Sequence, residues 1–285
     1  MLLWPVSKPV RAEHIWHKAL HVSDSALATG ALIPLQTRLL DGKGLAPFQL
    51  RQLLSRPPRH LGSQGPKLNP FLPWDPPLEV EQLPSGHVVI LNKYPVQKAH
   101  LLLITEDWQP QGGWLRPRDW QAVARLGADT GGLWFFNSCA QAGASQRHRH
   151  LQLLPRHAGE PSCPLASLLV GQLEKRTEGW PWAYRLSRRT DPNAGSDLPT
   201  LYADHCRSLG IGDPGDQRAP QGAYNLLFDD DWFMSVLRVR EHCAGFSVNA
   251  LGFAGFLLRT HSSDQTWLSR EGPWQLLREV AAPGC

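Results

Sequence analysis

Residues 137–152 read NSCAQAGASQRHRHLQ, and the fold is decided by the end of this stretch. In a β-strand, successive side chains point to opposite faces of the sheet. A strand that runs through the two histidines therefore places four polar side chains on one face: Gln146, His148, His150 and Gln152. Two imidazoles together with two carboxamides are unusual in a core and typical of a polar site. We predict a strand over residues 147–154 with a functional site on this face.

The small residues just before this strand, from Ala142 to Ser145, predict a turn. Such a turn lets backbone N–H groups and a serine hydroxyl approach phosphate oxygens. The residue types alone leave three interpretations of the two histidines open: a structural polar patch, a metal site and a nucleophile. A zinc site needs further ligands, and the remaining candidates show no recognised spacing: His100, Cys139, His157 and Cys163. The spacing therefore disfavours the metal site.

Outward from this stretch, the pattern alternates between helices and short strands. Helical spacing predicts helices over 11–29, 46–60, 117–130, 198–209 and 265–281. Runs of β-branched and apolar residues predict strands over 87–92, 99–105, 131–137, 147–154, 224–228 and 232–239, with the first two and the last two as antiparallel hairpins. Helices combined with antiparallel strands, twice along the chain, predict an α+β fold of antiparallel sheets with flanking helices.

Residues 157–197 show weak periodicity and divide the chain. We expect an N-terminal half over 1–160, a crossover over 161–197 and a C-terminal half over 198–285. The 25 glycines and 25 prolines agree with short strands and many turns.

Composition excludes several classes of protein. Hydrophobic residues make up 42% of the 285 residues, which is enough for a sizeable core. The net charge of +4, without a long basic run, argues against a nucleic-acid partner. No stretch approaches about 18 uninterrupted apolar residues, so we expect no membrane span. The start of the chain lacks the layout of a signal peptide, and the five cysteines form no CxxC pair, so we expect a reducing, cytoplasmic location.

The run GASQRHRHLQLLP at 143–155 resembles the transferase branch of the histidine-triad superfamily, with its His-x-His-x-Gln motif. More closely, the chain resembles the diadenosine tetraphosphate phosphorylases, also called ATP adenylyltransferases. Four blocks in the same order carry this resemblance: NPFLPWDPPLEV (69–80), LNKYPVQKAHLLLITEDWQPQ (91–111), WFFNSCAQAGASQRHRHLQLLP (134–155) and YNLLFDDDWFMSVLRVREHCAGFSVNALGFAGFLLR (224–259). The resemblance implies two histidine-triad-like halves, the first catalytic and the second completing the nucleotide site.

The resemblance also implies roles for the motif. His150 matches the nucleophile, which would form an adenylyl-histidine intermediate. His148 is expected to fix the orientation and tautomer of its neighbour. Gln152 stands where hydrolases of the superfamily have a third histidine; a carboxamide can hold a phosphate oxygen but cannot supply a proton at neutral pH. This favours nucleotidyl transfer over activation of water.

Further residues match substrate contacts of the family. Gly143, Ala144, Ser145 and Gln146 match the phosphate-contacting turn, and Asn137, Asn92, Lys93 and Asn249 match other substrate contacts. Arg56 stands where family members have a substrate-binding lysine, and Cys139 stands where many have glycine. Arginine is not a neutral replacement where a point charge is needed. If the backbone at Cys139 needs a positive φ, strain follows.

The implied activity is a nucleotidyltransferase: phosphorolysis of diadenosine tetraphosphate to ADP and ATP, and the reverse. The expected partners are diadenosine tetraphosphate, ATP, ADP and phosphate, with no nucleic acid and no membrane, and the expected state is a monomer. We expect a divalent cation such as magnesium to accompany the substrate, and no metal held by the protein itself. A metal-dependent dinucleoside polyphosphate hydrolase and a nucleotide-binding regulator without catalysis remain the alternatives.

Overall fold

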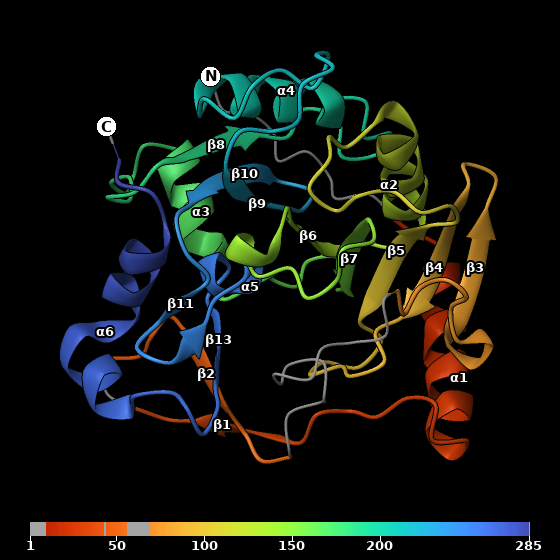
Figure 1. Ribbon diagram of the computed structural model, residues 1–285, viewed down its shortest axis with the longest axis horizontal. Coiled ribbons are helices and arrows are strands. Elements are labelled where there is room, and N and C mark those ends of the chain that lie inside the picture. The colour runs from red at the N-terminus through yellow and green to blue at the C-terminus, as the bar shows by residue number, and fades with distance from the viewer. Residues whose placement is uncertain (1–9, 43, 56–68, 285) are drawn as a thin grey trace.

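A computed structural model describes residues 10–42, 44–55 and 69–284 (Figure 1). Its helices are α1 His14–Ala28, α2 Pro117–Asp129, α3 Ala166–Leu173, α4 Leu198–Ser208, α5 Ala250–Phe253 and α6 Gln265–Val280, with 3₁₀ turns η2 Pro76–Leu78 and η3 Ala140–Ala142. Its strands are β1 Thr37–Leu40, β2 Gln49–Leu53, β3 Glu79–Leu83, β4 His87–Leu91, β5 Leu101–Thr105, β6 Gly132–Asn137, β7 His150–Pro155, β8 Tyr184–Arg188, β9 Ala223–Phe228, β10 Trp232–Arg238, β11 His242–Cys243, β12 Phe246–Ser247 and β13 Phe256–Arg259. The α+β class is confirmed.

An eight-stranded antiparallel sheet forms the centre of the molecule. Its strand order is β3-β4-β5-β7-β6-β9-β10-β8. The two predicted hairpins are present, as β4 with β5 and β9 with β10. The two halves of the chain meet where β6 pairs with β9, from Trp134 opposite Phe228 to Asn137 opposite Asn225. The histidine motif therefore lies on β7, one strand away from this junction.

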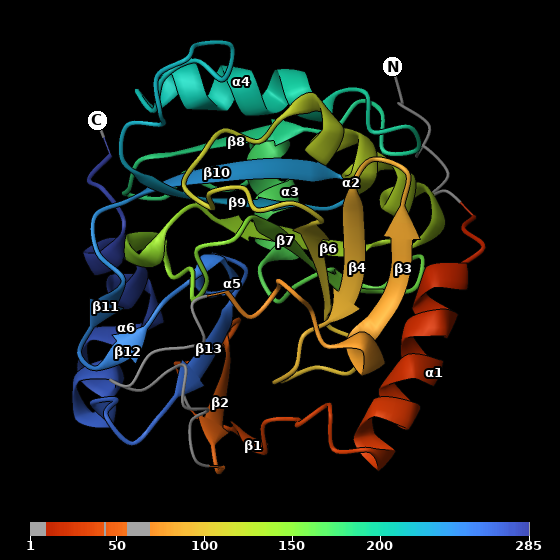
Figure 2. The ribbon, with the colours of Figure 1, turned by 45° about the vertical axis from the view of Figure 1, so that its right-hand side comes forward.

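The two faces of this sheet carry separate hydrophobic cores. Alternate residues of the strands, such as Leu151 and Leu153 of β7, pack in one core with α1, α2 and α4. Figure 2 shows α1 lying beside β3 at one end of the sheet. The other core contains Leu154 of β7 together with residues of α3, α5 and α6. None of the helices described here is long and apolar enough to cross a membrane.

A second, three-stranded sheet contains a segment that the sequence predicts to be helical. The predicted helix over 46–60 is wrong in its described part, because residues Gln49–Leu53 form strand β2. This strand pairs antiparallel with β1 and parallel with β13, so it brings residues near position 50 beside residues near position 258. Pairing with a segment about two hundred residues away overrides local propensity. Residues 56–60 lie outside the described residues.

The segment predicted as a crossover contains α3 and β8. Strand β8 pairs with β10 and forms one edge of the large sheet. The domain limits at residues 160 and 197 stay a prediction.

Candidate active site

A cleft of about 610 Å³ lies between the two sheets. Strands β6 and β7 line it on one side, with Phe135 and Gln152, and β2 and β13 line it on the other, with Arg51 and Phe256. Seven of the residues selected from the sequence line this cleft: Asn92, Asn137, Gly143, Ala144, Ser145, Gln152 and Asn249. Because these residues come from both halves of the chain, the fold assembles one site from two halves.

His150 is held as a neutral imidazole with one free nitrogen. It is the first residue of β7 and is 3% exposed. Its Nδ1 lies 2.8 Å from the carbonyl oxygen of His148. A carbonyl only accepts, so Nδ1 carries the hydrogen and Nε2 keeps its lone pair. Burial lowers the pKa of His150 to about 4, which keeps the ring neutral and nucleophilic near pH 7.

His148 acts on its neighbour through its backbone. Its Nε2 donates to the carbonyl oxygen of Thr105 at 2.8 Å, and its Nδ1 accepts from the amide of Asn69 at 3.0 Å. The ring therefore anchors this segment to β5 and to the 69–80 block. The carbonyl of His148, and not its imidazole, receives the hydrogen bond from His150. The strand begins at His150, later than predicted, because only one bridge, His148 opposite Pro110, precedes it.

A chain of hydrogen bonds fixes the amide of Gln152. The oxygen of Asn92 accepts from the backbone N–H of Tyr94, so its NH₂ group faces Nδ1 of His100 at 3.1 Å. Nδ1 of His100 then accepts, and Nε2 carries the hydrogen and donates to Oε1 of Gln152 at 2.9 Å. The NH₂ group of Gln152 is left to donate to an oxygen in the cleft.

Residue types and spacing alone present His100 only as a candidate metal ligand. Its position directly before β5, which pairs with β7 in the register of Leu101 opposite Leu153, brings it to Gln152. Burial lowers the pKa of His100 to about 4, so this ring is also neutral. The strand register that joins the two residues cannot be read from residue types.

A buried polar network fixes Asn137. Its Oδ1 accepts from the amide of Asn225 at 2.8 Å and from the backbone N–H of Ala250 at 2.9 Å. Asn225 in turn accepts from Arg238 at 2.5 Å. Arg238 is 2% exposed and donates its other hydrogens to backbone carbonyls, including that of Val248. Burial lowers the pKa of Arg238 to about 10, so it remains a cation beneath the site.

The predicted phosphate turn packs against the second half of the chain. Gly143 ends η3 with a φ of +87°, and a Cβ there would lie 2.6 Å from Cβ of Asn249. Asn249 caps α5 by accepting from the N–H of Leu251 at 2.9 Å. Cys139, with a φ of −161°, is in extended backbone that any residue adopts. Cysteine in place of glycine therefore introduces no strain.

Four other described candidates are not among the cleft-lining residues: His148, His150, Lys93 and Gln146. The ammonium of half-exposed Lys93, which directly follows Asn92, forms an ion pair with Asp75 at 3.1 Å. Gln146 is partly exposed. Arg56 lies outside the described residues. The roles suggested for Lys93, Gln146 and Arg56 stay predictions.

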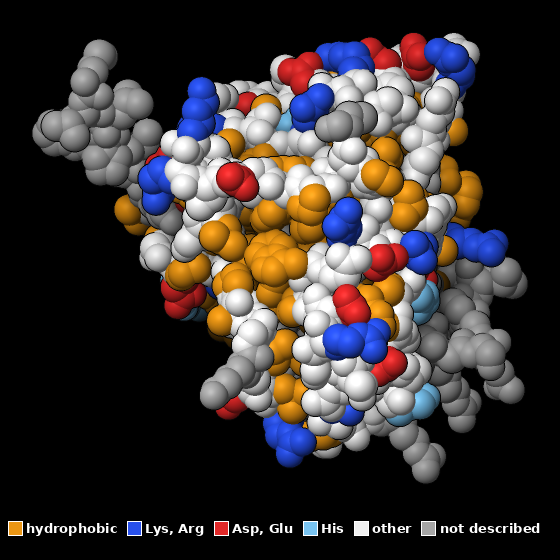
Figure 3. Space-filling view, turned by 90° about the vertical axis from the view of Figure 1, so that its left-hand side faces the viewer, with side chains coloured by type: hydrophobic (Ala, Val, Ile, Leu, Met, Phe, Trp, Pro, Cys, Tyr) orange, Lys and Arg blue, Asp and Glu red, His pale blue; other side chains and the backbone are white. Residues whose placement is uncertain are grey.

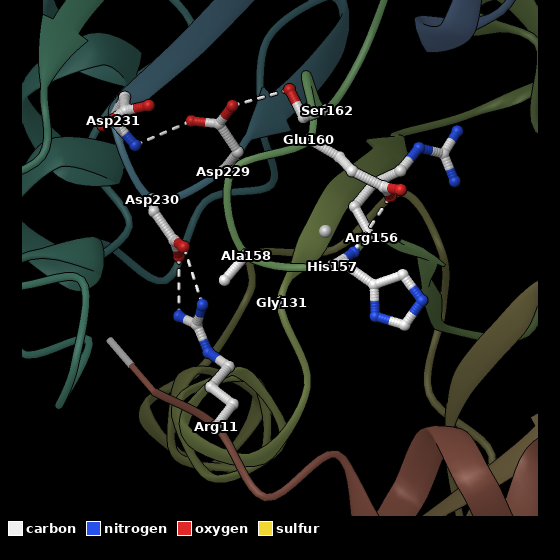
Figure 4. A pocket seen from close by; sticks show the side chains of 12 residues that line it. Arg11, Gly131, Arg156, His157, Ala158, Glu160, Ser162, Asp229, Asp230 and Asp231 are labelled. Carbon is white, nitrogen blue, oxygen red and sulfur yellow. Dashed lines mark hydrogen bonds and ion pairs between the residues drawn. The ribbon is translucent and has the colours of Figure 1, made fainter. Parts of the chain in front are cut away.

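The acidic run Asp229–Asp231 forms a hairpin turn, as its sequence predicts. Figure 4 shows the side chains of Asp229 and Asp230 paired in a small pocket, which shares no lining residue with the cleft. Asp229 accepts from the hydroxyl of Ser162 at 2.6 Å and from the backbone N–H of Asp231 at 2.7 Å, and Asp230 pairs with Arg11 through two bonds of 2.7 Å. In the described part of the chain, no group of three or more His, Cys, Asp or Glu residues could hold a metal ion.

The fold and the His-x-His-x-Gln strand together define a histidine-triad-like protein with two halves. Residues 6–171 match the family described as Ap4A phosphorylase N-terminal domain, and residues 178–283 match the ATP adenylyltransferase C-terminal domain. Ap4A is diadenosine tetraphosphate. The chain belongs to the Ap4A phosphorylase family.

Two curated proteins of Saccharomyces cerevisiae are similar in sequence over part of the chain. Protein APA1 is 36% identical over 77 residues, and diadenosine 5',5'''-P1,P4-tetraphosphate phosphorylase 2 is 29% identical over 116 residues. These matches cover 25% and 36% of this chain, and the chain spans only 24% and 36% of the length of those relatives.

Solved structures are similar over nearly the whole chain. The crystal structure of yeast Ap4A phosphorylase Apa2 in complex with Ap4A superposes with a TM-score of 0.71 at 18% identity, covering 97% of this chain and all of that one. The complex of Apa2 with AMP gives a TM-score of 0.72 at 19% identity, covering 96% of this chain and 99% of that one. This likeness shows the fold.

Proposed function

We propose that this protein is an ATP adenylyltransferase that splits diadenosine tetraphosphate with inorganic phosphate into ADP and ATP, and runs the reverse reaction. One observation carries this proposal: neutral His150, with Nε2 unprotonated, precedes Gln152 on a strand that lines a cleft built from both halves. The family and the relatives named for phosphorylase activity support the same chemistry.

The reaction runs in two displacements. First, Nε2 of His150 attacks the α-phosphorus of one adenosine, a P–N bond forms, the P–O bond to the leaving group breaks and ATP departs. Next, an oxygen of inorganic phosphate attacks the same phosphorus, the P–N bond breaks and ADP departs. Freeing the site between the steps lets phosphate enter where ATP left. The NH₂ group of Gln152 is placed to hold an α-phosphate oxygen in both steps, as a preorganised donor.

The product pattern tests this proposal. With diadenosine tetraphosphate and phosphate, we expect ADP and ATP in equal amounts, and with arsenate in place of phosphate we expect ATP and AMP. Intact-protein mass spectrometry after substrate is added without phosphate should show the added adenylyl group. Release of AMP and ATP at the same rate without phosphate would instead favour a metal-dependent hydrolase. Binding of the dinucleotide with no turnover and no adduct would favour a regulator.

We further propose the conditions under which the enzyme works. A divalent cation, such as magnesium, accompanies the polyphosphate substrate, because hard cations bind phosphate oxygens. The protein acts as a monomer on small nucleotides in the cytoplasm, without nucleic-acid or membrane partners. Four free cysteines in the described residues, Cys139, Cys163, Cys206 and Cys243, agree with a reducing compartment. Titration of activity with EDTA, light scattering and cell fractionation test these points.

A further inference from the structure

The carboxamide of Gln111 fills the space where strands β6 and β7 separate. Pairing of β6 with β7 ends at Phe135 opposite Gln152, whereas pairing of β6 with β9 continues to Asn137. Gln111 lies beside the end of the β6–β7 pairing and is only 3% exposed. Its own backbone N–H is fixed by the carbonyl of Arg147 at 2.8 Å. The side chain therefore has a rigid base.

Three hydrogen bonds join this carboxamide to the backbone of two residues of the site. Oε1 accepts from the N–H of His150 at 2.8 Å. Nε2 donates to the carbonyl of Asn137 at 2.7 Å and to that of His150 at 3.2 Å. The amide of Gln111 thus replaces the peptide group that a continuing strand would supply. It forms hydrogen bonds with both the N–H and the carbonyl of His150 and links them to Asn137 of β6.

We propose that Gln111 is a positioning residue for the nucleophile His150. It fixes where β7 begins, and so where the imidazole stands relative to Asn137 across the diverging strands. All three hydrogen bonds of the Gln111 carboxamide go to backbone groups of Asn137 and His150, so it acts through these contacts and not on substrate. A displacement of about 1 Å at a reacting group can cost about 10²-fold in rate. The inference rests on the proposed function, which makes His150 the nucleophile.

The test compares Gln111→Glu and Gln111→Met with the wild type. Glutamate can still accept from the N–H of His150, but its second oxygen faces two carbonyl oxygens in place of a donor. Methionine has a similar length and offers neither a strong donor nor a strong acceptor. For both variants we expect the single-turnover rate of adenylyl-enzyme formation to fall about 10- to 100-fold. The Kd for ADP should stay within about twofold, because the cleft-lining side chains are unchanged.

The matched control is Tyr202→Phe. It removes the buried hydrogen bond of 2.7 Å between Tyr202 and Tyr224, outside the cleft. This variant should lower Tm and leave both the adenylylation rate and the Kd for ADP unchanged. If the two Gln111 variants behave in the same way, Gln111 has only a structural role and the proposal is overturned. Failure of both variants to fold, while Tyr202→Phe folds, would overturn it as well.

The wild type in the same experiment separates this inference from the proposed function. A wild-type protein that binds nucleotide but never gains an adenylyl group contradicts the two-step reaction. That result would also contradict the positioning role of Gln111, because His150 would then not be a nucleophile. A wild-type protein that forms the adduct, beside Gln111 variants that form it equally fast, contradicts the positioning role alone. A parallel rise in Kd and fall in rate would show that Gln111 shapes the nucleotide cleft, which also contradicts the proposal.

Discussion

At the scale of single residues, the proposed chemistry depends on the unprotonated Nε2 of His150. The carbonyl of His148 holds the hydrogen on Nδ1, and burial keeps the ring neutral. We expect His150→Ala to lower kcat by about 10⁴-fold or more, because a covalent route is lost. Substrate binding should persist, and no adenylyl adduct should appear by mass spectrometry. Adduct formation in the His150→Ala protein would place the nucleophile elsewhere.

His148→Ala should be much milder. The variant keeps the backbone carbonyl that orients His150 and loses the ring's bonds to Thr105 and Asn69. Without these bonds the segment that carries His150 is held less firmly, which we expect to cost about tenfold in kcat. Steady-state kinetics beside His150→Ala provide the comparison. Equal losses in the two variants, with both proteins folded, would mean that the imidazole of His148 has a chemical role of its own.

Gln152 allows a test of how the acceptor is chosen. Gln152→Ala should weaken transition-state binding by about 2–3 kcal/mol, comparable with removing one preorganised donor. Gln152→His recreates a third imidazole, which can donate a proton or position water. We expect its total activity to fall and the ratio of AMP to ADP among its products to rise at fixed phosphate. An unchanged ratio would show that the acceptor is chosen elsewhere, and the role of Gln152 would have to be abandoned.

The sequence predicts which residues form this site better than it predicts the hydrogen bonds between them. Alternation along the strand correctly separates Gln152 from Leu151 and Leu153, which pack on the opposite face. It also places Arg149 away from His150, and that arginine is buried against Asp119 at 3.1 Å. Contacts across strands, such as His100 to Gln152, are not visible in one sequence because they depend on register.

At the scale of elements, the turn before β7 couples the two halves. Gly143 has a positive φ and lies in contact with Asn249, so Gly143→Ala adds both backbone strain and a clash. The strain alone costs about 1 kcal/mol. We expect the clash to move the turn away from the cap of α5, which should weaken binding of ADP about tenfold or more. Calorimetric titration measures this, with Gly86→Ala as the control.

Gly86 provides a matched control because its φ is +73° and no atom lies within 4 Å of a Cβ placed there. Gly86→Ala therefore carries the backbone strain without the contact. Backbone strain should lower the Tm of this variant, and its Kd for ADP should stay unchanged. If Gly143→Ala also leaves the Kd unchanged, the turn does not contribute to the nucleotide site.

Elements with strong local signals were predicted, and those defined by distant partners were not. The helix Pro117–Asp129 begins with proline and carries Trp120, Val123 and Leu126 at helical spacing, all buried. Strand β2 offers no comparable signal: in its sequence QLRQL only Leu50 is buried, and it lies among the polar residues Gln49, Arg51 and Gln52. Pairing with β1 and β13 sets its conformation, so local propensity wrongly predicts a helix there.

At the scale of the whole molecule, the two cores and the continuous sheet join both halves into one structure. The core behind the cleft includes an aromatic layer. The ring centroid of Trp180 lies 5.2 Å from that of Trp182 and 5.8 Å from that of Trp274. Figure 3 shows the face on the α6 side, where hydrophobic side chains gather in the middle of the view. The same packing therefore supports both the fold and the site. We expect protonation of buried groups to change the free energy of unfolding of the whole protein.

Three buried histidines predict the pH dependence of stability. Burial lowers the pKa of His100, His150 and His205 from 6.5 to about 4. Between these values the unfolded chain binds protons that the native protein excludes, so the free energy of unfolding must fall as pH drops from about 6.5 to about 4. Asp229 opposes this, because burial raises its pKa to about 7 and the native protein then binds one proton more in the same window.

The net difference of about two protons for these four groups corresponds to a slope of about 3 kcal/mol per pH unit near pH 5, and His148, whose pKa burial also lowers, adds to this slope. Urea unfolding at a series of pH values from 7.5 to about 5 measures this slope. His205 contacts Ser187 and Ser235 outside the cleft, so His205→Asn should flatten the slope by about one proton without changing the adenylylation rate. Asp229→Asn should steepen it by about one proton. If the free energy of unfolding of the Asp229→Asn protein, which lacks the opposing group, is constant across this range, these histidines bind protons as readily in the native protein as in the unfolded chain, and burial does not keep His150 neutral.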